Sequence, residues 1–95
     1  MSVLVIVQGA SATVEFSFLD VNGAVVDVSG VQIKAGIMDT TPSVIPSTRV
    51  SEGVWAANVN CPNPGFWVAR AECSNPIVDA QEVMWKVQPS KLNLT

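Results

Sequence analysis

The feature that most constrains the fold is the stretch from Gly53 to Cys73, which reads GVWAANVNCPNPGFWVARAEC. Apolar side chains occupy alternate positions in two runs, which is the pattern of a half-buried β-strand. The Pro-Asn-Pro-Gly sequence between the runs is typical of a turn. We therefore predict that residues 53–73 form a long antiparallel hairpin whose inward face supplies much of the core.

The register of this hairpin makes a prediction about the two cysteines. A turn at residues 63–64 places Cys61 beside Trp67. At the other end Trp55 lies beside Cys73, so that each indole faces a small side chain. The two thiols are then about six residues, or roughly 20 Å, apart, whereas a disulfide needs Cα atoms within about 7 Å. We expect two free, mostly buried thiols, consistent with synthesis in a reducing compartment.

Apolar runs before the hairpin predict further strands. Val3 to Val7 is continuously apolar, which fits a first strand covered on both sides. Residues 12–19 alternate between apolar and polar. The Asn22-Gly23 step that follows predicts a tight hairpin into residues 24–28, because both turn positions take positive φ.

Three more segments complete the chain. Residues 31–37 and 83–87 alternate and are predicted strands. Residues 44–50 contain Pro46, which lacks a backbone donor, so this segment is an edge strand at best. No stretch has sustained helical periodicity. About seven short strands at this spacing predict an all-β sandwich of two sheets over residues 1–90, followed by a tail at residues 91–95.

The predicted core consists of large apolar side chains in phase with the buried face of their strands. The tryptophans have an alternative role, because exposed aromatic residues on a sandwich can bind partners. Core packing is favoured, since each tryptophan is in phase with alanine or valine. The predicted core residues are Phe16, Phe18, Ile33, Trp55, Val59, Trp67 and Trp85.

The residue inventory argues against catalysis. Histidine and tyrosine are absent, which removes the commonest general base and the commonest transition-metal ligand. The cysteines lack zinc-ligand spacing. Asp20, Asn22 and Asp27 imitate part of a calcium loop, but the twelve-residue ligand pattern is missing, and such residues also tighten turns. We expect no enzymatic activity, no cofactor and no bound metal.

Charge and hydropathy also exclude several partners. The net charge is −3 and the five basic residues are scattered, which argues against nucleic-acid binding. No apolar run is long enough to span a membrane, and no secretion signal is recognisable, so we expect synthesis in the cytoplasm. Only 14% of residues are charged. Some surface is therefore either buried against other subunits or rich in hydroxyl and amide groups.

Four segments give the chain a resemblance to a known family. They read GASATVEFSFLDVNGAVVD, VQIKAGIMD, EGVWAANV…NPGFWVARAE and QEVMWKVQPS. In this order they resemble small immunoglobulin-like domains encoded by tailed bacteriophages. The resemblance implies an immunoglobulin-like antiparallel β-sandwich that serves as a non-enzymatic structural protein of the virion. It would attach to other virion proteins of the capsid, the head-to-tail neck or the tail, as a homo-oligomer or in multiple copies.

Two kinds of contact surface follow from the sequence. The first strand and the tail are candidates for strand addition onto a neighbour, unless the strand pairs only within its own sheet and the tail is disordered. Arg70 and Glu72 are candidates for an interface pair, with a solvated strand face as the alternative. The candidate interface residues are Val3, Val5, Arg70, Glu72, Leu92 and Leu94.

The alternative function is a free-standing recognition module. In that case, the loop at residues 40–43 and Asn63 would bind a cell-surface glycan or protein. Solution mass, co-sedimentation with capsids and glycan binding would separate the two functions.

Overall fold

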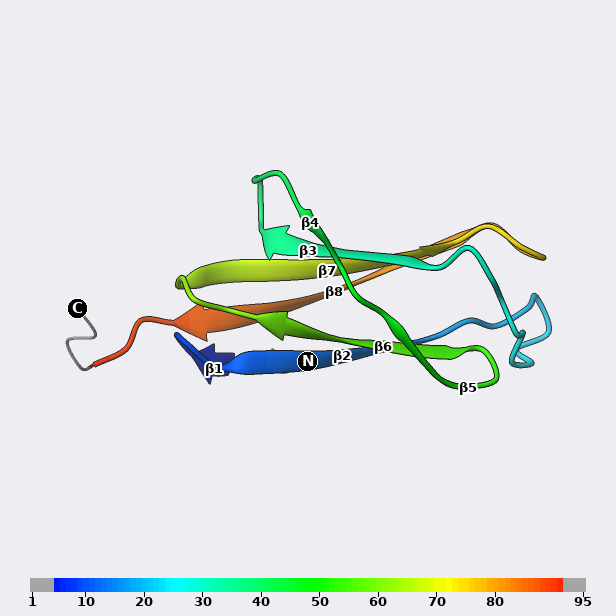
Figure 1. Cartoon of the computed structure of the whole chain (residues 1–95), viewed down its shortest axis with the longest axis horizontal. Helices are drawn as coiled ribbons and strands as arrows, with labels where there is room; N and C mark the ends of the chain where they lie inside the picture. The colour runs from blue at the N-terminus through cyan, green and yellow to red at the C-terminus, as the bar shows by residue number, and fades with distance from the viewer. Residues whose placement is uncertain (1–4, 92–95) are drawn as a thin grey trace.

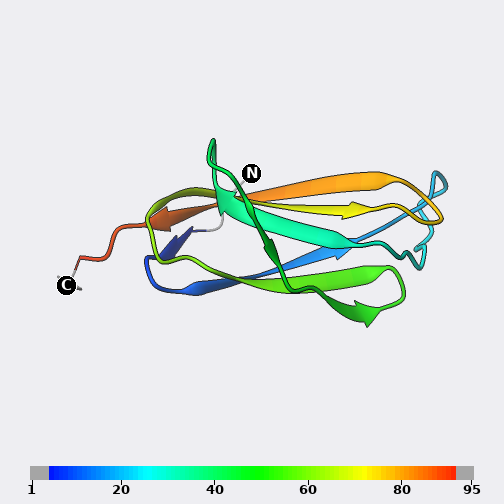
Figure 2. The ribbon, with the colours of Figure 1, turned by 45° about the horizontal axis from the view of Figure 1, so that its top comes forward.

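The computed structural model describes residues 5–91, which form two β-sheets packed face to face in an elongated molecule of 48 × 27 × 24 Å (Figures 1 and 2). The described residues contain eight strands and no helix, so none of them lies in a helix that could cross a membrane. The strands are β1 (Val5–Val7), β2 (Ser11–Ser17), β3 (Gln32–Ile37), β4 (Ser43–Ile45), β5 (Thr48–Ser51), β6 (Val54–Asn60), β7 (Gly65–Cys73) and β8 (Asp79–Gln88).

The strand order is that of an immunoglobulin-like sandwich. One sheet has five strands in the order β1-β8-β7-β3-β4, and the other has three in the order β2-β6-β5. In this order β8-β7-β3-β4 correspond to the G-F-C-C′ strands of that fold and β2-β6-β5 to the B-E-D strands, with β1 added beside β8. The predicted fold class is confirmed with one correction: β1 pairs with β8 in parallel, and the other strand pairs are antiparallel.

The core lies between the sheets because each long strand turns its alternate apolar residues inward. In β2 the burial alternates without interruption, and β7 buries every second residue from Trp67 to Cys73. Six of the seven expected core residues are buried, and Trp55 is only half-buried. The buried six are Phe16, Phe18, Ile33, Val59, Trp67 and Trp85.

The predicted hairpin of residues 53–73 is wrong. Its two arms, β6 and β7, belong to different sheets. Residues 61–64 between them carry the chain from one sheet to the other, and Pro62 and Pro64 in this link have no backbone donor for a ladder. The apolar faces of the two arms meet across the core and not side by side within one sheet. Apolar residues alternate in the same way whether the two arms pair within one sheet or face each other from two sheets. The sequence pattern therefore could not show that the arms do not form a hairpin.

The neighbours of the tryptophans change accordingly. Trp67 lies directly opposite Trp85 on β8, and Trp55 lies opposite Phe16 on β2, so large side chains are paired and not matched with small ones. The Trp67 Nε1 donates to the Asn63 carbonyl at 2.9 Å. The indole N–H groups of Trp55 and Trp85 are buried without an acceptor among the described residues.

The expectation for the cysteines is confirmed although the register that suggested it is wrong. Cys61 and Cys73 are both free and buried. Cys61 follows β6 in one sheet and Cys73 ends β7 in the other. Burial raises the pKa of the Cys73 thiol above its usual value, so the reactive thiolate is disfavoured there.

Two expectations about the N-terminal half need correction. β1 is an edge strand covered on one face only, because Val5 and Val7 are 47% and 52% exposed. The Asp20–Gly23 turn forms as expected, but only Gly23 has positive φ. Residues 24–28 make a single bridge, between Leu19 and Val25, and no regular strand.

The edge-strand prediction for residues 44–50 is consistent with the structure, which divides the segment in two. β4 is the edge of the five-stranded sheet and β5 is the edge of the other, and Pro46 lies where the chain crosses between them. Arg49 on β5 makes two hydrogen bonds to Asp27, at 3.0 and 2.9 Å. This pair ties the irregular segment of residues 24–28 to the three-stranded sheet.

Candidate functional site

The outer face of the five-stranded sheet carries a row of charged side chains. Arg70 on β7 bonds Glu72 at 3.0 Å and Glu82 on β8 at 2.9 Å, while the Lys34 amine is 4.0 Å from Glu72. The hydrogen bonds to Glu82 and Glu72 raise the pKa of Arg70. These pairs are exposed and so contribute little to stability. The two candidate interface residues Arg70 and Glu72 therefore satisfy each other on this face.

Beside this row lies a group of apolar side chains on the same outer face. Val68 is directly opposite Met84, and Met38, just after β3, donates its backbone N–H to the Phe66 carbonyl. Phe66, Met84 and Met38 are 49%, 47% and 41% exposed, and Val68 is half-buried. We call these four residues the apolar patch. Single exposed apolar residues are ordinary, but a contiguous group bordered by charges is typical of a protein contact site.

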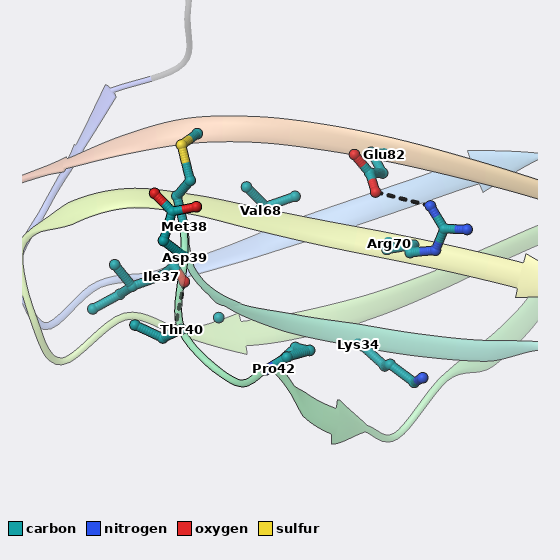
Figure 3. A pocket seen from close by; sticks show the side chains of 10 residues that line it. Lys34, Ile37, Met38, Asp39, Thr40, Pro42, Val68, Arg70 and Glu82 are labelled. Atoms are coloured by element: carbon teal, nitrogen blue, oxygen red, sulfur yellow. Dashed lines mark hydrogen bonds and ion pairs between the residues drawn. The ribbon is translucent and has the colours of Figure 1, made fainter.

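A cleft of about 220 Å³ lies between the apolar patch and the charged row (Figure 3). Met38 and Val68 border it on the apolar side, and Arg70 and Glu82 close it on the charged side. The rest of its lining comes from the β3–β4 connection and from β3 itself: Asp39, Thr40 and Pro42, with Lys34, Gly36 and Ile37. Thr40 fixes this connection through a hydrogen bond from its hydroxyl to the Ile37 carbonyl.

Only one of the two segments predicted for recognition, residues 40–43, contributes to the lining of this cleft. Thr40 and Pro42 line the cleft, but Asn63 does not belong to its lining. The Asn63 carbonyl is used instead by the indole N–H of Trp67. The two predicted recognition segments do not share this cleft, but Thr40, Thr41 and Ser43 line a separate hollow together with Pro62 and Trp67, which lie next to Asn63.

Of the other candidate interface residues, Val5 alone falls within the part of the chain that the structure describes. Val5 is exposed on β1, whereas Val3, Leu92 and Leu94 lie outside the described residues. The alternation of each strand predicts its buried face, and the apolar patch lies on the opposite face, so the alternation did not predict it. The available signal was that Phe66, Val68 and Met84 are apolar in the opposite phase, next to Trp67 and Trp85.

The residues that the structure describes contain no group of three or more acidic, cysteine or histidine side chains placed to hold a metal ion. Arg49 and Arg70 form surface ion pairs with nearby carboxylates, and both thiols are buried. In the comparisons with known proteins, no family model matches the sequence and no curated protein is significantly similar to it.

Proposed function

We propose that this protein is a non-enzymatic structural component of a tailed-phage particle, which attaches to another virion protein through the apolar patch. The observation that carries this proposal is the exposure of Phe66, Met38 and Met84 on a face that the fold does not need to cover. Burying such side chains against a partner releases water from apolar surface, which favours association. The resemblance to phage immunoglobulin-like domains supports the choice of partner.

The charged side chains beside the apolar patch would set the orientation in which this protein binds its partner. Arg70, Glu72 and Glu82 stand at the border of the apolar side chains and stay partly in water. Charged groups at the rim of an interface influence specificity and association rate more than affinity. The capsid, the head-to-tail neck and the tail remain the candidate attachment points.

The test is incorporation into tailed-phage particles, measured as co-sedimentation of this chain with assembled heads and tails. The double substitution Phe66→Ser and Met84→Ser should reduce co-sedimentation about tenfold or more, since central apolar contacts dominate binding. Val21→Ser with Val50→Ser is a matched control, because both are exposed apolar side chains outside the five-stranded sheet, and it should leave co-sedimentation unchanged. Equal incorporation of both variants would contradict the proposal.

A recognition module for a cell-surface glycan or protein is the second candidate, favoured by the cleft that Thr40 and Pro42 line. Its walls combine apolar side chains with the charges of Arg70 and Glu82, a mixture that polar ligands use. A glycan array and binding to host cells would test it. Binding that survives the apolar-patch substitutions and is lost on Thr40→Ala would favour this second function.

A further inference from the structure

The four edges of the two sheets are not equally protected against pairing with another chain. Within the part of the chain that the structure describes, β1 and β4 have three residues each, and Pro46 follows β4 directly. β5 has four residues with an irregular register between Arg49 and Ser51. Short strands, proline and bulges are the usual means by which proteins protect sheet edges. β2 is different: it has seven residues, regular register, no proline and no lysine.

The backbone groups on the outer side of β2 can be assigned from the ladder with β6. Ala10 accepts from Cys61 and Phe18 donates to Gly53, so even-numbered residues bond toward β6. The odd-numbered residues then direct their N–H and C=O groups away from β6. The Ser17 carbonyl agrees with this assignment, because it accepts from the Gln81 side chain at 2.7 Å.

Three consecutive outward positions remain on this edge: Ser11, Thr13 and Glu15. Within residues 5–91 no strand pairs with this side of β2. The inner side chains of the strand, Ala12, Val14 and Phe16, are already buried. The outer edge of β2 therefore presents a row of backbone donors and acceptors. Another β-strand carries the complementary backbone groups and can pair with this row.

We propose that two copies of this chain pair through β2, antiparallel and about a two-fold axis at Thr13. In this register Thr13 faces Thr13 of the second copy, and Ser11 faces Glu15. Each opposite pair exchanges two backbone hydrogen bonds, so every outward group of the three residues is satisfied. The two three-stranded sheets join into one continuous sheet with no β2 edge left open.

Charge favours a second copy in this register. Glu15 is the only charged residue of β2, and it lies opposite a serine, which keeps the two carboxylates apart. Like charges directly opposite each other would be destabilising, whereas paired threonines are favourable. Ser17 lies outside the paired segment, consistent with its carbonyl bond to Gln81. Because three residues bury a small area, we expect a weak dimer that forms at high local concentration.

Disulfide trapping tests both the contact and its register. In Thr13→Cys the opposed Cα atoms are about 5.5 Å apart, which a disulfide can bridge. In Ser11→Cys the equivalent atoms are about 13 Å apart, four residues out of register. Under mild oxidation Thr13→Cys should give about tenfold more dimer than Ser11→Cys, whereas Ser11→Cys mixed with Glu15→Cys should give the mixed dimer. Denaturing gels without reductant and intact mass report each species.

A charge test requires no oxidation. Thr13→Lys places two lysines opposite each other and should weaken self-association several-fold in sedimentation equilibrium. Ser17→Lys adds the same charge on the same strand outside the paired segment and should leave it unchanged. Absence of a Thr13→Cys dimer, or equal trapping at positions 11 and 13, would overturn the proposal. These outcomes are independent of particle attachment through the apolar patch.

Discussion

The outer faces of the two sheets differ although their inner faces are alike. Both sheets turn apolar side chains inward. Outside, the three-stranded sheet presents hydroxyl and amide pairs, with Ser11 bonding Asn60 at 2.7 Å and Thr13 bonding Asn58 at 2.6 Å. The five-stranded sheet presents the apolar patch beside paired charges. The fold requires only the inner faces, so this outer difference is what we expect if, as proposed, the five-stranded sheet meets a partner through the apolar patch.

The largest predicted effect is a difference in the free energy of unfolding between a substitution on the inner face of the five-stranded sheet and one on its outer face. Trp85→Ala should lower the free energy of unfolding by about 3–5 kcal/mol, because a buried indole leaves a cavity. Phe66→Ala should lower it by less than about 1 kcal/mol, as expected for an exposed position. Chemical denaturation monitored by tryptophan fluorescence and circular dichroism measures both. Equal losses would mean that Phe66 belongs to the fold and not to a contact face.

A smaller effect is expected on the outer face of the three-stranded sheet. Asn58→Ala removes the amide that accepts from the Thr13 hydroxyl, an exposed bond that contributes about 0.5–1 kcal/mol. A double-mutant cycle with Thr13→Ala isolates the pair. A coupling much larger than this, measured by urea denaturation, would mean that the polar face is a structural network and not a solvated surface.

The smallest effect concerns the ion pair at the edge of the three-stranded sheet. Hydrogen bonding to Arg49 holds the pKa of Asp27 below its usual value of 3.8, so the folded chain binds this proton more weakly than the unfolded chain. The stabilisation is therefore present above about pH 4 and is lost as the pH falls below the lowered value. Asp27→Asn should be slightly less stable than the wild type at pH 7. The difference should vanish in acid, and a difference independent of pH would assign it to another cause.

The sequence predicted which side chains face the core better than it predicted which strands pair. Alternation in residues 53–73 correctly marked Trp67 and Val59 as inward. It could not distinguish a hairpin from two strands that face each other across the sandwich, because inward positions alternate identically in both. The link at residues 61–64 decides this, and its two prolines fit either arrangement.

Local turn chemistry was easier to predict than long-range placement. The Asp20–Gly23 turn is specified by its own residues, since the Asp20 carboxylate accepts from the backbone N–H groups of Asn22 and Ala24. The apolar patch depends on β7 and β8 being neighbours and on Met38 ending beside Phe66. That placement is set by tertiary packing, so the outward apolar residues of one segment did not by themselves predict a continuous patch.

Methionine oxidation provides the most direct test of the contact face, because Met38 and Met84 both belong to the apolar patch and are exposed. Hydrogen peroxide converts exposed methionine to its sulfoxide, and peptide mass spectrometry measures the rate at each position. We predict rapid oxidation of both in the free protein and protection of both in the assembled particle, whereas a methionine introduced by Val50→Met on the other sheet stays reactive. Unchanged rates at Met38 and Met84 on assembly, with protection at position 50, would contradict the account.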